Sequence, residues 1–206
     1  MSADDIPDGH HDMAKDTPER TENAKVWAEM IRPEMDLNSE KVILDFGCGT
    51  GIVGLNFLGS VKKIIFQDVS QRSLEQCKKN LNETGQKNFE IFHGEINQYT
   101  GEKVDYIIAS MVYHHIQDIN GVTKELFARL NPKGKLIICD FNANDIIFQK
   151  TRPNVPYFGL DPTDLCKMFT DCGFKSTEIK PANPLTLEID GSKVTGQRYT
   201  IIAEAP

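Results

Sequence analysis

Long apolar runs and a leader segment are absent from the sequence. None of its 206 residues lies in a stretch apolar and long enough to span a bilayer, and no charged and then apolar segment opens the chain. We therefore expect no membrane segment and a cytoplasmic location. The composition, 39% hydrophobic and 26% charged, is typical of a soluble globular protein, and the length favours one domain.

Cysteine pairs and an excess of positive charge are also lacking. The five cysteines show neither CxxC spacing nor a paired framework, which argues against disulfides and structural zinc and predicts reduced thiols. Lys and Arg number 23 against 30 Asp and Glu, which gives a net charge of −7. Such a chain is not expected to bind nucleic acid over an extended surface, although a local patch such as Lys62-Lys63 stays open. No metal site is predicted.

What the sequence has instead is a regular alternation of short apolar runs and helical patterns. The segments KVILDF, KKIIFQ, NFEIFH, VDYIIAS and KLIICDF are typical of strands, and GIVGLNFLG, SQRSLEQCKKNLN and INGVTKELFARLN of helices. This alternation predicts an α/β fold with a mostly parallel sheet and helices on both faces. The last two extended runs, FKSTEIK and LTLEIDGSKVTGQRYTIIAEA, have no helix between them, so one antiparallel strand is expected near the C-terminus.

The sequence also predicts a helix before the first strand and another before the last two extended runs. Residues 1–16 are polar and without apolar periodicity, which predicts a flexible arm. Thr17 as N-cap and Pro18 at the first helical position then begin a helix. Its predicted core face consists of Ala24, Trp27, Ala28 and Ile31. The segment DPTDLCKMFTDCGF predicts another helix, capped by Asp161 and closed by Gly173.

The segment VILDFGCGTGIVG, residues 42–54, places four glycines in eight positions after an apolar strand. Such a loop brings backbone N–H groups to the carboxyl end of the strand, where open α/β sheets bind ligands. No lysine follows the glycines, so a Walker-type phosphate loop is excluded. The dinucleotide pattern GxGxxG does occur from Gly49 to Gly54, but it begins three residues past the strand end. Gly54 is expected to allow close contact between helix and strand.

The same segment resembles motif I of the class I S-adenosylmethionine-dependent methyltransferases, in which alternate glycines follow an acidic residue. Here the acidic residue is Asp45, and the glycines are Gly47, Gly49 and Gly51. The resemblance implies that this loop, with Cys48 and Thr50, wraps the methionine and ribose part of S-adenosylmethionine. A carboxylate attracts a positively charged sulfonium and repels a pyrophosphate, so Asp45 favours this cofactor.

Acidic residues after the next two strands agree with that cofactor. Asp68 ends the second strand, about twenty residues after the loop, where a carboxylate can accept both ribose hydroxyls. Nicotinamide enzymes use the same arrangement, so Asp68 fits either cofactor. The neighbouring Val69 is assigned to the same site. The resemblance further implies that Glu95 binds the adenine amino group and that Ile96 lies against the adenine ring.

The fourth strand and the residues after it carry a further resemblance. VDYIIASMVYHHIQD is similar to a segment found chiefly in branches of the family that methylate small molecules. It places Ser110 and Met111 at the cofactor and His114 and His115 near the acceptor. Because a neutral imidazole can accept a proton near pH 7, either histidine is a candidate catalytic base, and His115 is the better one. The alternative is that one histidine packs beneath the site. The Asn/Asp-Pro-Pro-Tyr/Phe box of enzymes that methylate bases is missing.

The resemblance covers residues 10–205 and implies a Rossmann-like, seven-stranded fold. Residues 17–206 are expected to form a single methyltransferase domain, and its three parts are a helical lid at 17–40, a cofactor-binding half at 41–140 and an acceptor-side half at 141–206. The implied activity is methyl transfer from S-adenosylmethionine to a small-molecule acceptor, whose identity stays open, as does the oligomeric state. Two alternatives remain. One is a catalytically silent member of the fold that binds cofactor or acts as a partner subunit, and the other is a nicotinamide-dependent oxidoreductase.

Overall fold

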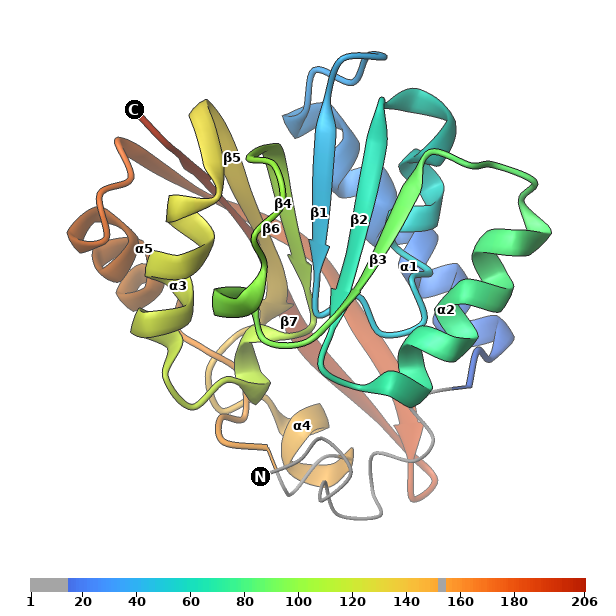
Figure 1. The fold of residues 1–206 in the computed structure, drawn as a ribbon. Coiled ribbons are helices and arrows are strands. Elements are labelled where there is room, and N and C mark those ends of the chain that lie inside the picture. The colour runs from blue at the N-terminus through green and yellow to red at the C-terminus, as the bar shows by residue number, and fades with distance from the viewer. Residues whose placement is uncertain (1–14, 152–154) are drawn as a thin grey trace.

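Seven strands form one sheet in the order β3-β2-β1-β4-β5-β7-β6 in the computed structural model, which describes residues 15–151 and 155–206 (Figure 1). The strands are β1 Val42–Phe46, β2 Lys63–Asp68, β3 Phe89–His93, β4 Val104–Ser110, β5 Leu130–Phe141, β6 Ser176–Ile189 and β7 Ser192–Glu204. The strands β1 to β5 pair in parallel, and β7 is antiparallel to both of its neighbours. The predicted mostly parallel sheet with one reversed strand is confirmed.

Helices cover both faces of this sheet. They are α1 Pro18–Ile31, α2 Gln71–Glu83, α3 Ile119–Ala128, α4 Ile146–Thr151 and α5 Pro162–Asp171, with short three-ten helices η3 Arg32–Glu34, η4 Gly54–Ser60, η5 Ile96–Gln98 and η6 Tyr113–His115. One core cluster joins the sheet to α3 and α5, and a second joins it to α1, η4 and α2. Successive β1 residues point to opposite faces, so Leu44 belongs to the first cluster and Ile43 to the second.

Two helices begin and end where the sequence signals place them. In α1 the Thr17 side chain accepts a hydrogen bond from Arg20 N, and the four residues of the predicted core face are buried. In α5 the Asp161 carboxylate accepts from two backbone N–H groups, and the chain turns away at Gly173, which has φ +107°. Capping and periodicity are local signals, and here they suffice.

The helix predicted directly after the glycine loop differs from the expectation. The structure has the three-ten helix η4, which begins at Gly54 and runs to Ser60. The Asn56 side chain donates to the Ile52 and Val53 carbonyls, which an α-helix would use for its own backbone hydrogen bonds. Two glycines in the segment further weaken an α-helix.

The β6–β7 hairpin extends beyond the rest of the sheet. β7 is registered with β5 from Arg198 to Glu204, whereas its first half pairs with β6 alone. β6 continues through Pro184 because a bulge between Ala182 and Leu185 sets two residues against one on β7. The carboxyl ends of β1 and β2 point to the bottom of Figure 1, where α4 and the tip of this hairpin also lie.

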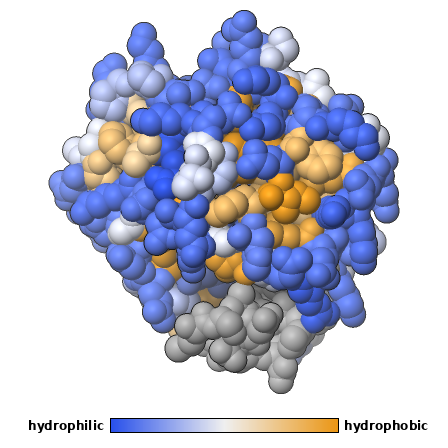
Figure 2. Space-filling view, viewed as in Figure 1, coloured by the Kyte–Doolittle hydropathy of each residue, from blue (hydrophilic) through white to orange (hydrophobic). Residues whose placement is uncertain are grey.

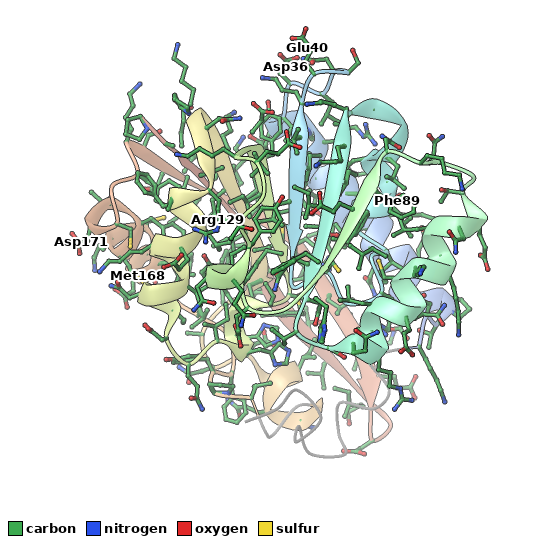
Figure 3. The ribbon with its side chains drawn as sticks, in the orientation of Figure 1. Asp36, Glu40, Phe89, Arg129, Met168 and Asp171 are labelled. Carbon is green, nitrogen blue, oxygen red and sulfur yellow. The ribbon has the colours of Figure 1, made fainter. Side chains whose placement is uncertain are left out.

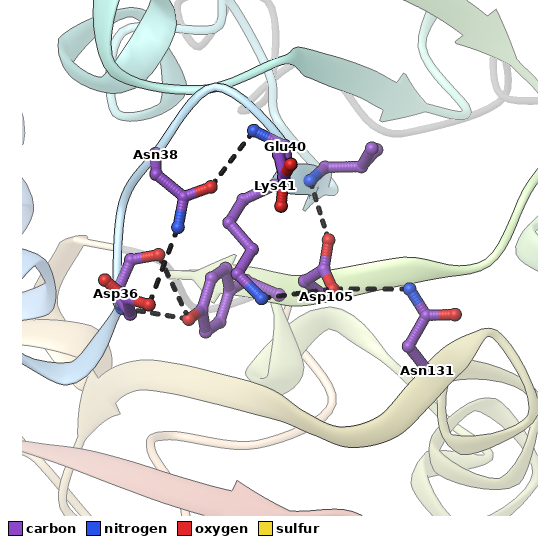
Figure 4. Close-up of polar contacts among 8 residues, drawn as sticks. Asp36, Asn38, Glu40, Lys41, Asp105 and Asn131 are labelled. Carbon is purple, nitrogen blue, oxygen red and sulfur yellow. Dashed lines mark hydrogen bonds and ion pairs between the residues drawn. The ribbon is translucent and has the colours of Figure 1, made fainter.

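At the amino ends of the strands, opposite these carboxyl ends, polar side chains form a hydrogen-bonded network (Figure 4). The Asp105 carboxylate accepts from Val42 N at 2.9 Å and forms an ion pair with Lys41 at 3.7 Å. Asp36 N donates to the Tyr106 hydroxyl at 2.9 Å. Figure 3 shows Asp36 at the top of the molecule, away from the glycine loop. These contacts hold the amino ends of the strands and leave the carboxyl ends for function.

The face seen in Figure 2 is mostly hydrophilic, with hydrophobic residues gathered right of centre, in the area that β2 and β3 occupy in Figure 1. β3 is an edge strand, and its Phe89, Ile91 and Phe92 are half-buried. Within residues 15–151 and 155–206, none of the helices has the length and apolar character needed to cross a bilayer.

Candidate functional site

The glycine loop between β1 and η4 adopts a backbone that only glycine takes easily. Gly47, Gly49 and Gly51 have φ values of +61°, +56° and +77°, in the left-handed region. A Cβ atom on Gly47 would lie 2.3 Å from Val112 Cγ2, and one on Gly51 would lie 2.6 Å from Cys77 Sγ. A Cβ atom on Gly49 would meet no atom of the described residues within 4 Å. Packing therefore requires the outer two glycines, while the middle one borders open space that a ligand can enter.

Side chains at the end of β2 hold this loop in place. The Asp68 carboxylate accepts from Gly49 N at 2.7 Å and from Ser70 N at 2.8 Å. The buried Gln67 accepts from Gly47 N at 3.1 Å and donates to the Gly94 carbonyl at 2.7 Å, so it ties the β1 loop to the β3 loop. A carboxylate offers about four acceptor positions, so Asp68 keeps capacity for a ligand.

Asp45 lies under the loop rather than on an open wall. Its side chain is buried and accepts a hydrogen bond from Gly54 N at 3.1 Å. Burial raises the pKa of Asp45 to about 7, the Gly54 hydrogen bond opposes that rise, and the nearby Asp68 adds to it. Burial also raises the pKa of Asp68. A Cβ atom on Gly54 would lie 2.5 Å from Asp45 Oδ2, which agrees with close packing as the purpose of that glycine.

A cavity of about 340 Å³ opens beside the loop. The predicted site residues on its wall are Gly47, Cys48, Gly49, Thr50, Ser110 and Met111. The Ser110 hydroxyl is buried and has no hydrogen-bond partner within the described parts of the chain. Met111 has φ +60°, a strained value for a side chain of its size. An orphaned hydroxyl and a strained residue on one wall are features typical of a binding site.

The other walls of the cavity come from α1, α4 and the β6–β7 hairpin, which the glycine motif could not indicate. They include Arg20, Asn23, Ala24, Trp27, Phe141, Ile147, Leu185, Leu187 and Arg198. The Arg198 guanidinium carbon lies 4.5 Å from the centre of the Trp27 ring. Trp27 is a core residue, as its helical spacing predicts, and one of its surfaces also borders the cavity.

The start of α1 is anchored to the glycine loop. Asp16 accepts hydrogen bonds from the Thr50 hydroxyl and from Asn80 Nδ2, and Asn80 also donates to the Thr50 carbonyl. Asp16 is the last residue of the predicted arm, and residues 1–14 of that arm lie outside the described residues. The start of α1 is therefore held at the glycine loop.

The two predicted catalytic histidines lie on η6, after β4. His114 is fully buried, and its Nδ1 lies 2.9 Å and 3.0 Å from the two oxygens of Asp140. His115 is half-buried, with its ring centre 4.2 Å from that of His114. Among the described residues that form the cavity wall neither histidine appears. The interpretation that one histidine packs beneath the site fits His114, and a catalytic role for His115 stays a prediction.

The remaining predicted residues lie at the ends of β2 and β3, outside the cavity. The Val69 carbonyl is 3.1 Å from His93 Nε2. Glu95 is exposed and caps η5, whereas Ile96 is buried in the core cluster on the α3 and α5 side. Their predicted contacts with adenine stay predictions.

The described residues contain neither a cluster of metal ligands nor a disulfide. Within residues 15–151 and 155–206, no group of three or more His, Cys, Asp or Glu side chains is arranged to hold a metal ion. Asp145 instead accepts from the backbone N–H groups of Ile147 and Gln197, which ties α4 to β7. All five cysteines are free thiols, as predicted.

Most of the chain matches a known protein family. A family model described as a methyltransferase domain matches residues 37–187, which include the glycine loop, part of the cavity wall, and His114 and His115. This chain belongs to that methyltransferase family. Together with the sheet order and the loop, the match places it among the class I S-adenosylmethionine-dependent methyltransferases.

Curated relatives of this chain include two methyltransferases. It is 24% identical over 168 residues to an uncharacterised methyltransferase of Schizosaccharomyces pombe, covering 73% of this chain and 59% of the relative. It is 29% identical over 128 residues to a ubiquinone/menaquinone biosynthesis C-methyltransferase of Rickettsia bellii, covering 57% and 51%. The chain thus spans between half and three-fifths of the length of these curated relatives.

A solved structure with the same fold is magnesium protoporphyrin IX methyltransferase from Synechocystis, which holds S-adenosylhomocysteine. Its TM-score is 0.67 at 14% identity, and the match covers 97% of this chain and 94% of that one. At this identity the likeness shows the fold alone, so the acceptor has to be inferred from the cavity.

The residues of the methyltransferase fit a cofactor that carries positive charge. Two neighbouring carboxyl groups, Asp45 and Asp68, have pKa values raised chiefly by burial, so their backbone hydrogen bonds do not fully compensate the charged forms. A cation nearby would supply that compensation, whereas a pyrophosphate would add repulsion. The open space at Gly49 and the unpartnered Ser110 hydroxyl lie on the same side of the loop.

The raised pKa of Asp45 predicts a pH-dependent stability. Because the pKa is about 7 in the folded protein and about 3.9 in the unfolded chain, the folded state binds the proton more tightly. The Asp45 contribution is therefore full below about pH 4 and is lost as the pH rises to about 7. Asp45→Asn removes this dependence and can still accept from Gly54 N. In urea unfolding, the free energy of unfolding of the variant relative to that of the parent should rise by about 2–3 kcal/mol between pH 5 and pH 8. If the free energies of unfolding of the two proteins changed with pH in parallel, Asp45 would not have a raised pKa.

The contact between His114 and Asp140 predicts a cost for removing the carboxylate. Asp140→Ala takes an acceptor from His114 Nδ1 and from Phe141 N, which Asp140 binds at 2.8 Å. Buried groups that lose a partner cost about 1–3 kcal/mol each, so we expect a loss of about 2–4 kcal/mol in urea unfolding. Asp171→Ala is the matched control, because Asp171 is exposed on α5 (Figure 3) and should change stability by less than about 0.5 kcal/mol. Equal stability of the two variants would argue against this pair as a structural element.

Proposed function

We propose that this methyltransferase binds S-adenosylmethionine across the glycine loop and Asp68, and transfers the methyl group to a small-molecule acceptor in the cavity. The observation that carries the proposal is the position of Gly49. Its N–H bonds the Asp68 carboxylate, and the space beside its Cα is open. The bound cofactor would supply a methyl group already activated on a positively charged sulfur.

Each protein group has a distinct part in binding. Asp68 lies at the end of β2, where its free acceptor positions can take the two ribose hydroxyls. Asp45 supports the loop through Gly54 N and supplies negative charge beneath it. Glu95 and Ile96 follow β3, where the adenine would lie. Ser110, with its unpartnered hydroxyl, and Met111 form the wall at the end of β4.

The protein's main catalytic task is to align the acceptor and to exclude water. Trp27, Phe141, Ile147 and two hairpin leucines make the far wall of the cavity largely apolar. Well-oriented reactants can lower a barrier by up to about 7–11 kcal/mol, and a poorly solvated site suits a reaction in which charge is neutralised. The Asp16 contact with Thr50 holds α1 over the loop, which is the closure such a site needs.

A proton acceptor is required only if the acceptor atom loses a proton during transfer, and His115 is the candidate on this chain. It follows β4 by five residues and is only half-buried, unlike His114. His115→Ala is expected to keep the affinity for S-adenosylhomocysteine and to slow methyl transfer from a labelled donor. Unchanged transfer would remove His115 from the mechanism and leave the cofactor assignment intact.

Direct binding tests the cofactor assignment. Isothermal titration calorimetry of the intact chain with S-adenosylhomocysteine should give a saturable, one-site curve, and the same experiment with NAD should give none. A saturable curve with NAD alone would contradict the proposal and favour an oxidoreductase.

A further inference from the structure

Arg198 is a buried cation whose surroundings the glycine motif does not explain. Only 5% of its surface is exposed, yet it borders the cavity. Its Nε donates to the Asn183 carbonyl at 2.6 Å, and its guanidinium lies 4.5 Å from the Trp27 ring centre. Asn183 belongs to the β6 bulge, which turns that carbonyl toward β7. Backbone and ring together fix the plane of the guanidinium.

The positive charge of Arg198 has no matching carboxylate. Within residues 15–151 and 155–206, Arg198 makes no ion pair, and Nε is its one guanidinium nitrogen with a hydrogen-bond acceptor. The nearby acids are engaged elsewhere, since Asp140 binds His114 and Asp145 binds backbone N–H groups of Ile147 and Gln197. A desolvated cation without a counterion is costly unless a ligand supplies one.

We propose that Arg198 and Trp27 form a subsite for a carboxylate group on the methyl acceptor. This inference rests on the proposed function and narrows the acceptor to a small carboxylic acid with an apolar or aromatic body. The two terminal nitrogens of a guanidinium match the two oxygens of a planar carboxylate. The apolar side chains around them, among them Phe141 and Leu187, suit the rest of such a molecule.

The position of Arg198 separates it from the cofactor's own carboxylate. Arg20, the other arginine on the cavity wall, is seven residues before Trp27 on α1, a distance of roughly 10 Å along a helix. The start of α1 is the end anchored to the glycine loop through Asp16 and Thr50. Arg20 therefore lies nearer the predicted methionine end, and Arg198 lies with Trp27 deeper toward the hairpin wall.

Trp27 makes the test direct, because it is the single tryptophan of the chain. Its fluorescence is followed in the intact protein, with saturating S-adenosylhomocysteine, during titration with benzoate and with benzamide, its neutral counterpart. We expect benzoate to bind at least about tenfold more tightly than benzamide, as expected for a hydrogen-bonded charge pair. Arg198→Met should remove this preference, and Arg198→Lys should restore part of it. Lys193→Met, which removes an exposed charge from the same strand, should leave it unchanged.

Several outcomes would overturn the carboxylate subsite. They are equal binding of benzoate and benzamide, no saturation by benzoate, and saturation by phenyl phosphate where benzoate fails. A loss of S-adenosylhomocysteine affinity in Arg198→Met, measured by calorimetry, would also overturn it, because Arg198 would then serve the cofactor. If the parent protein binds no S-adenosylhomocysteine, the proposed function fails, while benzoate titration without that ligand still decides whether Arg198 binds a carboxylate.

Discussion

Asp68→Ala is expected to lower the affinity for S-adenosylhomocysteine by about 10²–10⁴-fold. In the proposed site this carboxylate accepts hydrogen bonds from two ribose hydroxyls, and each hydrogen bond to a charged group contributes about 1.5–3 kcal/mol. The variant also loses the acceptor that holds Gly49 N at 2.7 Å, which loosens the loop itself. Calorimetric titration of both proteins measures the change.

The matched control for that experiment is Asp105→Ala. Asp105 also accepts a hydrogen bond from a backbone N–H, that of Val42 at 2.9 Å, but it lies at the amino ends of the strands, opposite the glycine loop (Figure 4). It should cost some stability and leave cofactor affinity unchanged. Normal affinity in Asp68→Ala, in a protein that unfolds at the parent's temperature, would sink the assignment of the ribose site.

The second large effect is expected from alanine at neighbouring glycines of the loop, where the same substitution should have two different consequences. Gly49→Ala places its Cβ in open space, so the folded protein bears only the left-handed backbone strain, about 1 kcal/mol. The added methyl group occupies the space proposed for the cofactor, and overpacking of about 1–3 kcal/mol predicts a loss of affinity of roughly 5- to 150-fold. Calorimetry with S-adenosylhomocysteine measures the affinity.

Gly47→Ala should act mainly on the fold. Its Cβ would lie 2.3 Å from Val112 Cγ2, so overpacking adds to the backbone strain, and urea unfolding should show a loss of about 2–4 kcal/mol. If Gly49→Ala instead bound S-adenosylhomocysteine as the parent does, the ligand would not pass over Gly49, and the loop would have to hold it differently.

Features set by neighbouring residues could be predicted from the sequence. The N-caps Thr17 and Asp161 begin their helices as expected, and the glycine-rich segment forms the loop that was expected after the first strand. Each of these signals lies within a few residues of the structure that it determines.

Features that depend on distant parts of the chain could not be predicted. Arg198 meets Trp27, 171 positions away in the sequence, because a bulge at Pro184 lets β6 continue and extends the hairpin to α1. Prolines ordinarily end a strand pattern, so the sequence divides β6 into two runs. Gln67 and Asp16 were missed as well, since nothing local shows that their side chains reach the glycine loop. The sequence signal for Gln67 is its position, since it is a polar residue at the end of an apolar strand run and directly before Asp68.

Methyl transfer to a small molecule can be measured with a labelled donor. The intact protein is incubated with S-adenosylmethionine labelled on the methyl group and the small-molecule fraction of a cell extract, beside the Asp68→Ala variant. We expect a labelled product with the parent and almost none with the variant, and we expect benzoate to reduce the amount of product formed. No labelled product above the variant's background, from a protein that binds S-adenosylhomocysteine normally, would contradict methyl transfer to a small molecule and favour a catalytically silent, cofactor-binding role.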